Sequence, residues 1–308
     1  MTYSAGVGIA NFPFEDARGF WKWVDLCEAG GVDSIWQSDR FIGRDQNLEC
    51  MSVMAALAGA TKRIKFGMNV ASLGLRDPFL TAKACATIDV LSEGRMLPAF
   101  GVGSSLCRDY SATGVPTRGR GKRTDEGLEI LSRLWSEESV SFAGKYYQLD
   151  EASIAPRPVQ QPLPLWVGGS APQAIDRTAR WGTGWQAGVD SADQVGPVIK
   201  AIKAATLKYD RTIDEDHFGA GFGFRFGNPE EGPTKAYIEA LTKRLGRAPD
   251  KFLAIGDETV VMQRIHEFIE SGVHKFILRP IGRDADEMMD QTKLLIDKVL
   301  PQVVALNR

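Results

Sequence analysis

Two glycine-rich segments have the composition of loops that bind phosphate. The first, Gly-Gly-Ser-Ala-Pro at 168–172, follows a short apolar stretch and precedes a helical pattern. The first turn of a helix offers unpaired amide N–H groups and a positive dipole end, which suit a phosphate. Ser170 adds a hydroxyl, although a plain serine-capped turn has the same composition. We therefore predict that Gly168, Gly169 and Ser170 bind a cofactor phosphate.

The second segment, Gly-Val-Gly-Ser-Ser at 101–105, ends another apolar stretch. It departs from the dinucleotide fingerprint G-x-G-x-x-G because Leu106 occupies the last glycine position. A Rossmann-type site is therefore weakly supported. Gly101, Gly103 and Ser104 remain candidates for lining a cofactor, and packing of the loop against a neighbour is the alternative.

An aspartate and an arginine, Asp39 and Arg40, end the apolar stretch 33–39. A carboxylate at the carboxyl end of a parallel strand faces the ligand site, so Asp39 is predicted to orient a substrate or handle a proton. Arg40 is a permanent cation that either pairs with Asp39, holds an anionic substrate, or forms a surface salt bridge. Both are candidate catalytic residues, and we expect Asp39 to matter more.

The elements that position these residues alternate between strand and helix. Helix-capping residues, apolar periodicity and turn residues predict the following segments. The strands are 6–11, 33–39, 64–70, 96–102, 165–167, 184–187, 221–226 and 275–278. The helices are 16–30, 48–60, 78–91, 124–136, 172–181, 192–209, 259–271 and 284–300, with an extra helix at 233–245.

Eight strands, each followed by a helix, predict an α/β fold of the closed (β/α)8 TIM barrel type. An open, doubly wound sheet is the alternative. Residues 140–149 predict a small hairpin insertion, and the proline-rich segment 155–164 predicts an irregular connector. Because no linker separates two cores, residues 1–308 are expected to form a single domain.

Composition excludes several classes of protein. The 308 residues carry a formal net charge of −2, which gives no electrostatic footprint for nucleic acid. No apolar run spans a bilayer, and the N-terminus lacks the features of a secretory signal, so we expect a cytoplasmic protein without membrane contact. The cysteines lack metal-ligand spacing and are expected to be reduced thiols: Cys27, Cys50, Cys85 and Cys107.

The remaining polar clusters give weaker predictions. Three histidines, His217, His266 and His274, lack metal-ligand spacing, so no metal site is predicted. A basic, glycine-spaced segment at 118–123 is expected to form a loop, either solvated or clamping an anionic cofactor tail.

Five segments, taken in order, resemble the bacterial luciferase-like monooxygenase family, especially its flavin- and F420-dependent oxidoreductases. They are the Asp-Ser-Ile-Trp-Gln-Ser-Asp stretch at 33–39 and the segments 55–67, 81–103, 134–186 and 255–282. The resemblance implies a (β/α)8 barrel that binds reduced FMN or the deazaflavin coenzyme F420. It favours monooxygenation of a small organic substrate with reduced FMN and oxygen. F420-dependent hydride transfer is the alternative, and a non-catalytic flavin-binding barrel is a second one.

The resemblance also implies roles for individual residues. Relatives have a non-prolyl cis peptide behind the flavin ring, which places it at Asn69–Val70, with Ala71 beside it. Many F420-dependent relatives have Ser-Asp-His where this chain has Ser38-Asp39-Arg40, so a histidine-based proton transfer is in doubt. The loop 101–104 would line the phosphate or the ribityl chain.

Substrate contacts are predicted near strand ends, where apolar walls exclude water: Phe12, Trp36, Trp185, Phe224 and Arg225. We also expect a homodimer or higher homo-oligomer, and a separate flavin or F420 reductase as partner.

Overall fold

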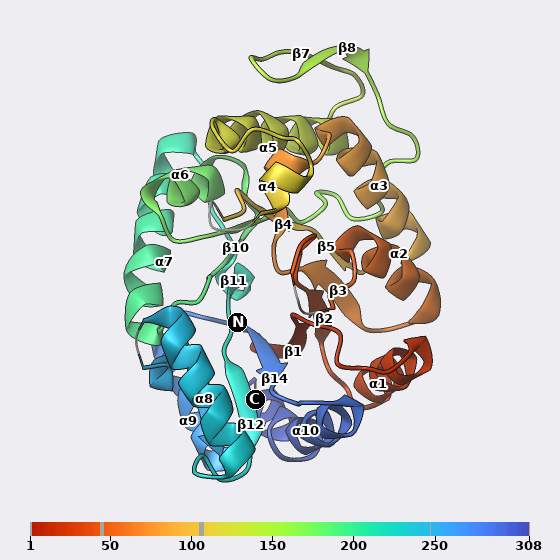
Figure 1. The fold of residues 1–308 in the computed structure, drawn as a ribbon. Helices are drawn as coiled ribbons and strands as arrows, with labels where there is room; N and C mark the ends of the chain where they lie inside the picture. Colours follow the sequence, from red (N-terminus) through yellow and green to blue (C-terminus); the bar gives the residue numbers. More distant parts are fainter. Residues whose placement is uncertain (1, 44–45, 105–107, 247, 308) are drawn as a thin grey trace.

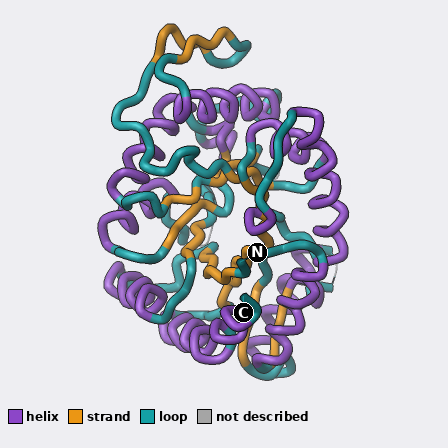
Figure 2. Tube along the Cα trace, turned by 180° about the vertical axis from the view of Figure 1, so that it is seen from behind, coloured by secondary structure: helices purple, strands orange, loops and turns teal. Residues whose placement is uncertain are grey.

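The computed structural model describes residues 2–43, 46–104, 108–246 and 248–307. Parallel strands form a central ring, and helices surround it (Figure 1). Figure 2 shows the same arrangement from behind, with the hairpin projecting beyond the helices. No helix in these ranges is both long and apolar enough to cross a membrane.

The ring has eight strand positions, as predicted. Five are continuous: β1 (Ser4–Ile9), β2 (Ser34–Gln37), β9 (Trp166–Gly168), β10 (Gly184–Gln186) and β14 (Lys275–Pro280). Three are interrupted: β3 (Lys65–Met68) with β4 (Ala71–Ser72), β5 (Met96–Leu97) with β6 (Ala99–Gly101), and β11 (Phe218–Ala220) with β12 (Gly223–Phe226).

Strand pairing closes the ring. The order runs β4, β6, β9, β10, β11, β14, β1, β2, β3, β5, and every pair in it is parallel. Because β3 and β4 occupy one position, and β5 and β6 the next, both ends of this order meet at the same neighbours. The predicted TIM barrel is confirmed, and the open sheet is not formed.

The helices begin and end close to the predicted positions. They are α1 (Ala17–Ala29), α2 (Cys50–Ala60), α3 (Pro78–Leu91), α4 (Asp109–Ala112), α5 (Arg120–Ser136), α6 (Pro172–Trp181), α7 (Ala192–Thr206), α8 (Gly232–Leu245), α9 (Glu258–Glu270), α10 (Ala285–Lys298) and α11 (Leu300–Ala305). Aspartates fix several starts: the Asp77 carboxylate accepts from the Leu80 amide at 2.8 Å, as the Asp-Pro sequence predicts. The insertion is the hairpin β7 (Val140–Ala143) and β8 (Gln148–Ala152).

Three local predictions were wrong. The short strand β13 (Leu253–Gly256) pairs with β12 and was not predicted, since four apolar residues before a helix cap carry little periodic signal. The basic segment 118–123 is not a loop, because α5 begins at Arg120 and takes up Lys122 and Arg123. The seventh barrel position starts three residues earlier than predicted and breaks at Gly221.

Side chains in the barrel interior form layers. Trp36, Leu97, Ala99, Trp166 and Ile277 make a closed apolar layer, all at most 7% exposed. Above Ile277, toward the carboxyl ends of the strands, lies a hollow of about 120 Å³ whose lining includes Asn69, Gln186, Gly221 and Arg279. The interior therefore changes from apolar packing to polar groups at the end where barrel enzymes place their sites.

A glycine substitution tests this packing. A Cβ on Gly221 would lie 1.9 Å from the carbonyl oxygen of Ile277, so Gly221→Ala must displace β14. We expect a loss of about 3 kcal/mol in the free energy of unfolding, the upper range for overpacking. The control is Gly59→Ala in α2, where a Cβ meets nothing within 4 Å. Urea denaturation should show the control unchanged or up to about 1 kcal/mol more stable, and equal stability of the two variants would contradict the described packing.

Candidate active site

A cavity of about 750 Å³ opens at the carboxyl end of the barrel. Its walls are the ends of β1, β2, β12 and β14, together with residues of α8. The polar part of the lining includes Asn11, Ser38 and Asn69, and the apolar part includes Leu241, Phe252 and Met288. Among the described residues, its charged lining consists of one acid and four bases: Asp39, Arg40, Arg225, Arg279 and Arg283.

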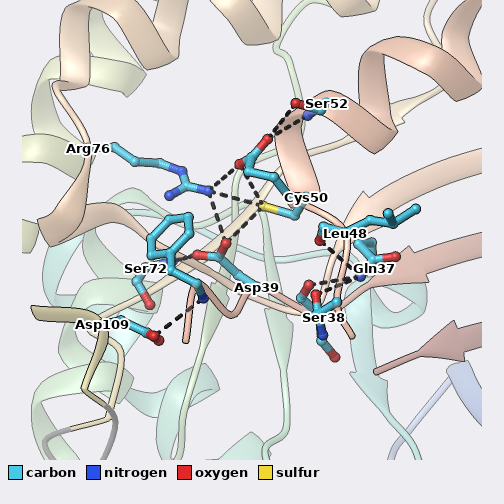
Figure 3. Close-up of polar contacts among 12 residues, drawn as sticks. Gln37, Ser38, Asp39, Leu48, Cys50, Ser52, Ser72, Arg76 and Asp109 are labelled. Atoms are coloured by element: carbon cyan, nitrogen blue, oxygen red, sulfur yellow. Dashed lines mark hydrogen bonds and ion pairs between the residues drawn. The ribbon is translucent and has the colours of Figure 1, made fainter. Parts of the chain in front are cut away.

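Asp39 lies at the cavity edge but turns its carboxylate into the protein (Figure 3). Its Oδ1 accepts from Arg76 Nη2 at 3.0 Å and from the Cys50 thiol at 3.3 Å. Its Oδ2 accepts from the amide of Ser72 at 2.9 Å. The side chain is 2% exposed. The carboxylate that the sequence assigns to chemistry is thus engaged at both oxygens by protein groups.

Arg76 is the centre of this buried cluster. Its Nη2 contacts Asp39, Glu49 at 2.8 Å and the Cys50 sulfur at 3.2 Å. Burial alone would lower the pKa of Arg76, but the two carboxylates raise it above its usual value, so the side chain is cationic. Burial and the Asp39 carboxylate raise the pKa of Cys50 well above its usual value, which makes the thiol a poor nucleophile.

The same cluster has the composition of a metal-ligand set. Ligand atoms of Asp39, Glu49 and Cys50 lie within 4.8 Å of one another. The guanidinium of Arg76, however, hydrogen bonds to all three and supplies the positive charge that a metal ion would bring. We read the cluster as a buried ion-pair network and not as a metal site.

The partly exposed Val70 side chain packs on the apolar layer of the barrel interior, and we call it the Val70 wall. The Asn69–Val70 peptide is cis, which confirms the sequence prediction. A Cβ on Gly101 would lie 2.9 Å from a Val70 methyl group, and one on Gly168 would lie 2.8 Å away. These glycines therefore leave room for the Val70 side chain. The predicted cofactor residues Asn69, Val70, Gly101 and Gly168 are brought together, while Ala71 is fully buried beneath them.

The predicted phosphate donors are partly occupied. The Gly169 amide donates to the carbonyl of Gln186 at 3.2 Å, and the Ser170 hydroxyl donates to Asp190 at 2.5 Å. Three other amides at the start of α6 donate to no residue in the described part of the chain: those of Ser170, Ala171 and Gln173. An anion at this helix start would meet these three groups in place of the Gly169 amide and the Ser170 hydroxyl.

The other glycine-rich loop packs against its neighbours. Gly103 has φ +67°, and a Cβ there would lie 2.7 Å from Ser72 Oγ and 3.2 Å from the Tyr110 ring. The Tyr110 hydroxyl donates to the carbonyl of Val102 at 2.8 Å. Ser104 is exposed, and the predicted loop continues through 105–107, which lie outside the described residues and include Cys107.

Four of the five predicted substrate contacts lie outside the described cavity lining. Trp36, Trp185 and Phe224 are fully buried in the core, and Phe12 packs against Phe14 and Phe20. Only Arg225 lines the cavity. Alternation along β12 explains one error, because Gly223 and Arg225 face the cavity and Phe224 between them faces the helices.

All three histidines of the chain lie away from the cavity lining. His217 and His274 precede β11 and β14, at the amino ends of their strands, and His274 stacks on Tyr3 at 4.9 Å. His266 is exposed on α9. The mouth therefore has no imidazole to accept or donate a proton near neutral pH.

One carboxylate holds two of the cavity arginines. Glu287 of α10 accepts from Arg225 Nη1 at 2.9 Å and from Arg283 Nε at 2.7 Å. Arg225 also donates to the carbonyl of Ile281 at 2.9 Å. The hydrogen bond from Arg283 is the largest cause that lowers the pKa of Glu287 to about 2. Glu287 therefore holds both guanidinium groups beside the cavity.

Comparison with known proteins identifies the family. Residues 2–244 match the model of the family described as luciferase-like monooxygenase. The chain belongs to this family. Its members are oxidoreductases, so the protein is an enzyme of that class.

Sequence relatives cover nearly the whole chain. An F420-dependent glucose-6-phosphate dehydrogenase from Amycolatopsis mediterranei is 27% identical over 314 aligned residues, with 91% of this chain and 93% of the relative covered. One from Kineococcus radiotolerans is 28% identical, with 86% and 88% covered.

Solved structures of the family share the fold. An F420-dependent secondary alcohol dehydrogenase, in complex with an F420–acetone adduct, superposes with a TM-score of 0.82 at 17% identity and 99% coverage of both chains. The monooxygenase RslO1 from Streptomyces bottropensis superposes with a TM-score of 0.84 at 19% identity, covering 97% of this chain and 99% of its own. At these identities the likeness establishes the fold alone.

The Asp39 network gives the first prediction about the site. Asp39→Asn removes one charge from a buried pair and leaves Arg76 with Glu49 alone. Removing one partner of a buried ion pair lowers the free energy of unfolding by about 3–5 kcal/mol. Because Arg76 keeps its contact with Glu49, we expect a loss of about 3 kcal/mol. Glu49→Gln is the control, because Glu49 is 39% exposed and its loss should cost less. Denaturant titrations in which Glu49→Gln is the more damaging variant would contradict the central place of Asp39.

Glu287 gives a prediction in pH. A carboxyl group whose folded pKa lies below its unfolded value stabilises the fold above the unfolded pKa. That stability is lost as pH falls from 4.5 to about 2. In Glu287→Gln this part of the acid limb should flatten when the unfolding free energy is measured against pH. An acid limb of unchanged steepness would show that Glu287 is not held by Arg225 and Arg283.

Proposed function

We propose that the protein is an F420-dependent oxidoreductase that transfers a hydride between the deazaflavin and a small-molecule substrate. The observation that carries the proposal is the charged lining of the cavity. Four arginines line the space that a substrate would enter, beside apolar residues such as Leu241, Phe252 and Met288. The relatives named as F420-dependent dehydrogenases, matched over almost the full chain, support the same choice.

The arginines of the lining favour this choice over our first expectation, monooxygenation with reduced FMN. Oxygen chemistry on a reduced flavin calls for a dry, apolar enclosure that protects reactive species from water. The aromatic residues expected to form that enclosure are buried in the core. Hydride transfer between two carbon atoms depends mainly on the orientation of the reactants, which charged and polar groups provide well.

The residues at the mouth fit a flavin-like ring. Val70 offers apolar methyl groups, and Gly101 and Gly168 next to it add no side chain of their own. Gln186 is 2% exposed and lines the small hollow beside Asn69. Its Oε1 has no hydrogen-bond donor among the described residues, and a buried acceptor of this kind fits an N–H or O–H group of a ligand.

The cofactor supplies the redox chemistry when it is bound, and the protein holds and orients it. Val70 would back the ring, and Gln186 would accept a hydrogen bond from it. The amides of Ser170, Ala171 and Gln173 would hold the phosphate at the positive end of α6. The arginine-lined cavity would hold the substrate.

A binding titration tests the choice of cofactor. Tryptophan fluorescence should show that F420 binds at least about tenfold tighter than FMN. Gln186→Leu should weaken F420 binding by about tenfold, because a hydrogen bond to the buried acceptor is lost. Gln302→Leu on α11 is the control and should bind as the parent does. Tighter binding of FMN, together with oxygen uptake on addition of reduced FMN, would overturn the proposal in favour of monooxygenation.

A further inference from the structure

We propose that Arg40 is a specificity-determining residue that binds an anionic group of the substrate, a carboxylate or a phosphate ester. The inference rests on the proposed function for the reaction, but the anion site itself is argued from charge and contacts at the cavity. Under this proposal Arg40, which follows β2, binds the substrate and does not transfer a proton.

The cavity lining is rich in arginine, although the protein as a whole carries no net positive charge. The whole chain carries a formal net charge of −2, yet four arginines line this one space. They come from four places in the sequence: Arg40 after β2, Arg225 in β12, Arg279 in β14 and Arg283 before α10. Low-dielectric walls around like charges focus the potential and attract an anion.

Protein groups engage most of the charges in the described lining. Asp39, the one acid there, pairs with Arg76, which lies outside the lining. Glu287 pairs with both Arg225 and Arg283, and the carboxylates of Asp284 and Glu231 also lie near Arg283. Arg279 has an interaction of its own as well. The charge that stays available to a ligand is therefore that of Arg40.

Arg40 is the member of this set with no competing partner. Throughout residues 2–43, 46–104, 108–246 and 248–307 it forms no hydrogen bond or ion pair, and its side chain is exposed at the cavity. Asp39, its sequence neighbour, points the other way, toward Arg76 and Ser72. Arg40 therefore keeps its planar set of donors available, and these match a carboxylate or a phosphate in a bidentate manner.

A second arginine lies on the same side of the cavity. Strand β1 lies between β2 and β14. Gly8 of β1 has no side chain, and a Cβ there would lie 2.9 Å from Arg279 Cγ. The glycine thus leaves room for the Arg279 side chain beside β1. Arg279, Arg40 and Asn69 all line the same cavity.

Three ligands that share one sugar scaffold show whether the site prefers a phosphate, a carboxylate or a neutral group. Glucose 6-phosphate carries a phosphate ester at the sixth carbon, glucuronate a carboxylate, and glucose a neutral hydroxyl. Calorimetric titration of each into the F420-loaded protein, and into the protein without F420, gives the dissociation constants. We expect at least one of the two anions to bind about tenfold or more tightly than glucose, with the tighter one identifying the anion class. Added salt should weaken that preference.

Variants assign the preference to Arg40. Arg40→Gln should weaken anion binding about ten- to hundredfold and leave glucose and F420 binding unchanged. Arg40→Lys should restore part of the loss, because it keeps the charge without the bidentate fork. The control is Arg18→Gln, which removes an exposed arginine on α1 that is paired with Asp16.

Either of two results would overturn the inference: equal affinity of the parent protein for all three ligands, or an anion preference that survives in Arg40→Gln. Failure of the proposed function gives a different result from failure of the anion site, because the protein would then not bind F420. Anion binding that depends on Arg40 in the protein without F420 would then still support the anion site.

Discussion

The site depends on the direction in which the Asp39 carboxylate points. One oxygen accepts from Arg76 and the other from the amide of Ser72. Ser72 follows the Asn69–Val70 peptide by two residues, so this contact ties the end of β2 to the segment that presents Val70. The Val70 wall and the substrate cavity therefore depend on the same buried ion pair between Asp39 and Arg76. An ion pair 2% and 11% exposed is hard to replace, because either charge alone would be buried without a partner.

The same anchor determines the charge of the cavity. If Asp39 paired with Arg40, its carboxylate would neutralise a cation of the cavity lining. Arg76 takes that carboxylate, and the glycines at 8, 101 and 168 remove side chains from the mouth. What remains facing the cavity is Arg40, with Arg225, Arg279 and Arg283 around it. A site of this kind orients charged reactants and is a poor enclosure for oxygen chemistry.

The fold was predictable from local signals. Asp77-Pro78 marks the start of α3, and the alternation of apolar strands with amphipathic helices led to the barrel. The cis peptide at Asn69–Val70 was placed through family resemblance. Arg279 also ends an apolar run, as Asp39 does, so the position of a residue at a strand end is a signal that points to Arg279 as well.

The misassigned residues have physical causes. Trp185 and Phe224 lie near strand ends, and a short strand does not show which face points to the mouth. Arg76 lies 37 residues from Asp39, and only the closing of the barrel brings them together. The roles of Asp39 and Arg40 depend on that contact, so the sequence alone left them open.

The most direct test of this account is a crystal structure of the protein with F420 and an anionic sugar. We predict that the deazaflavin ring lies against Val70, with its phosphate at the start of α6 and the anionic group of the sugar bound by Arg40. The account would be contradicted if the ring bound in the half of the cavity lined by α8 and the cofactor phosphate bound Arg40. Val70 would then not be the ring wall, and Arg40 would not be the substrate site.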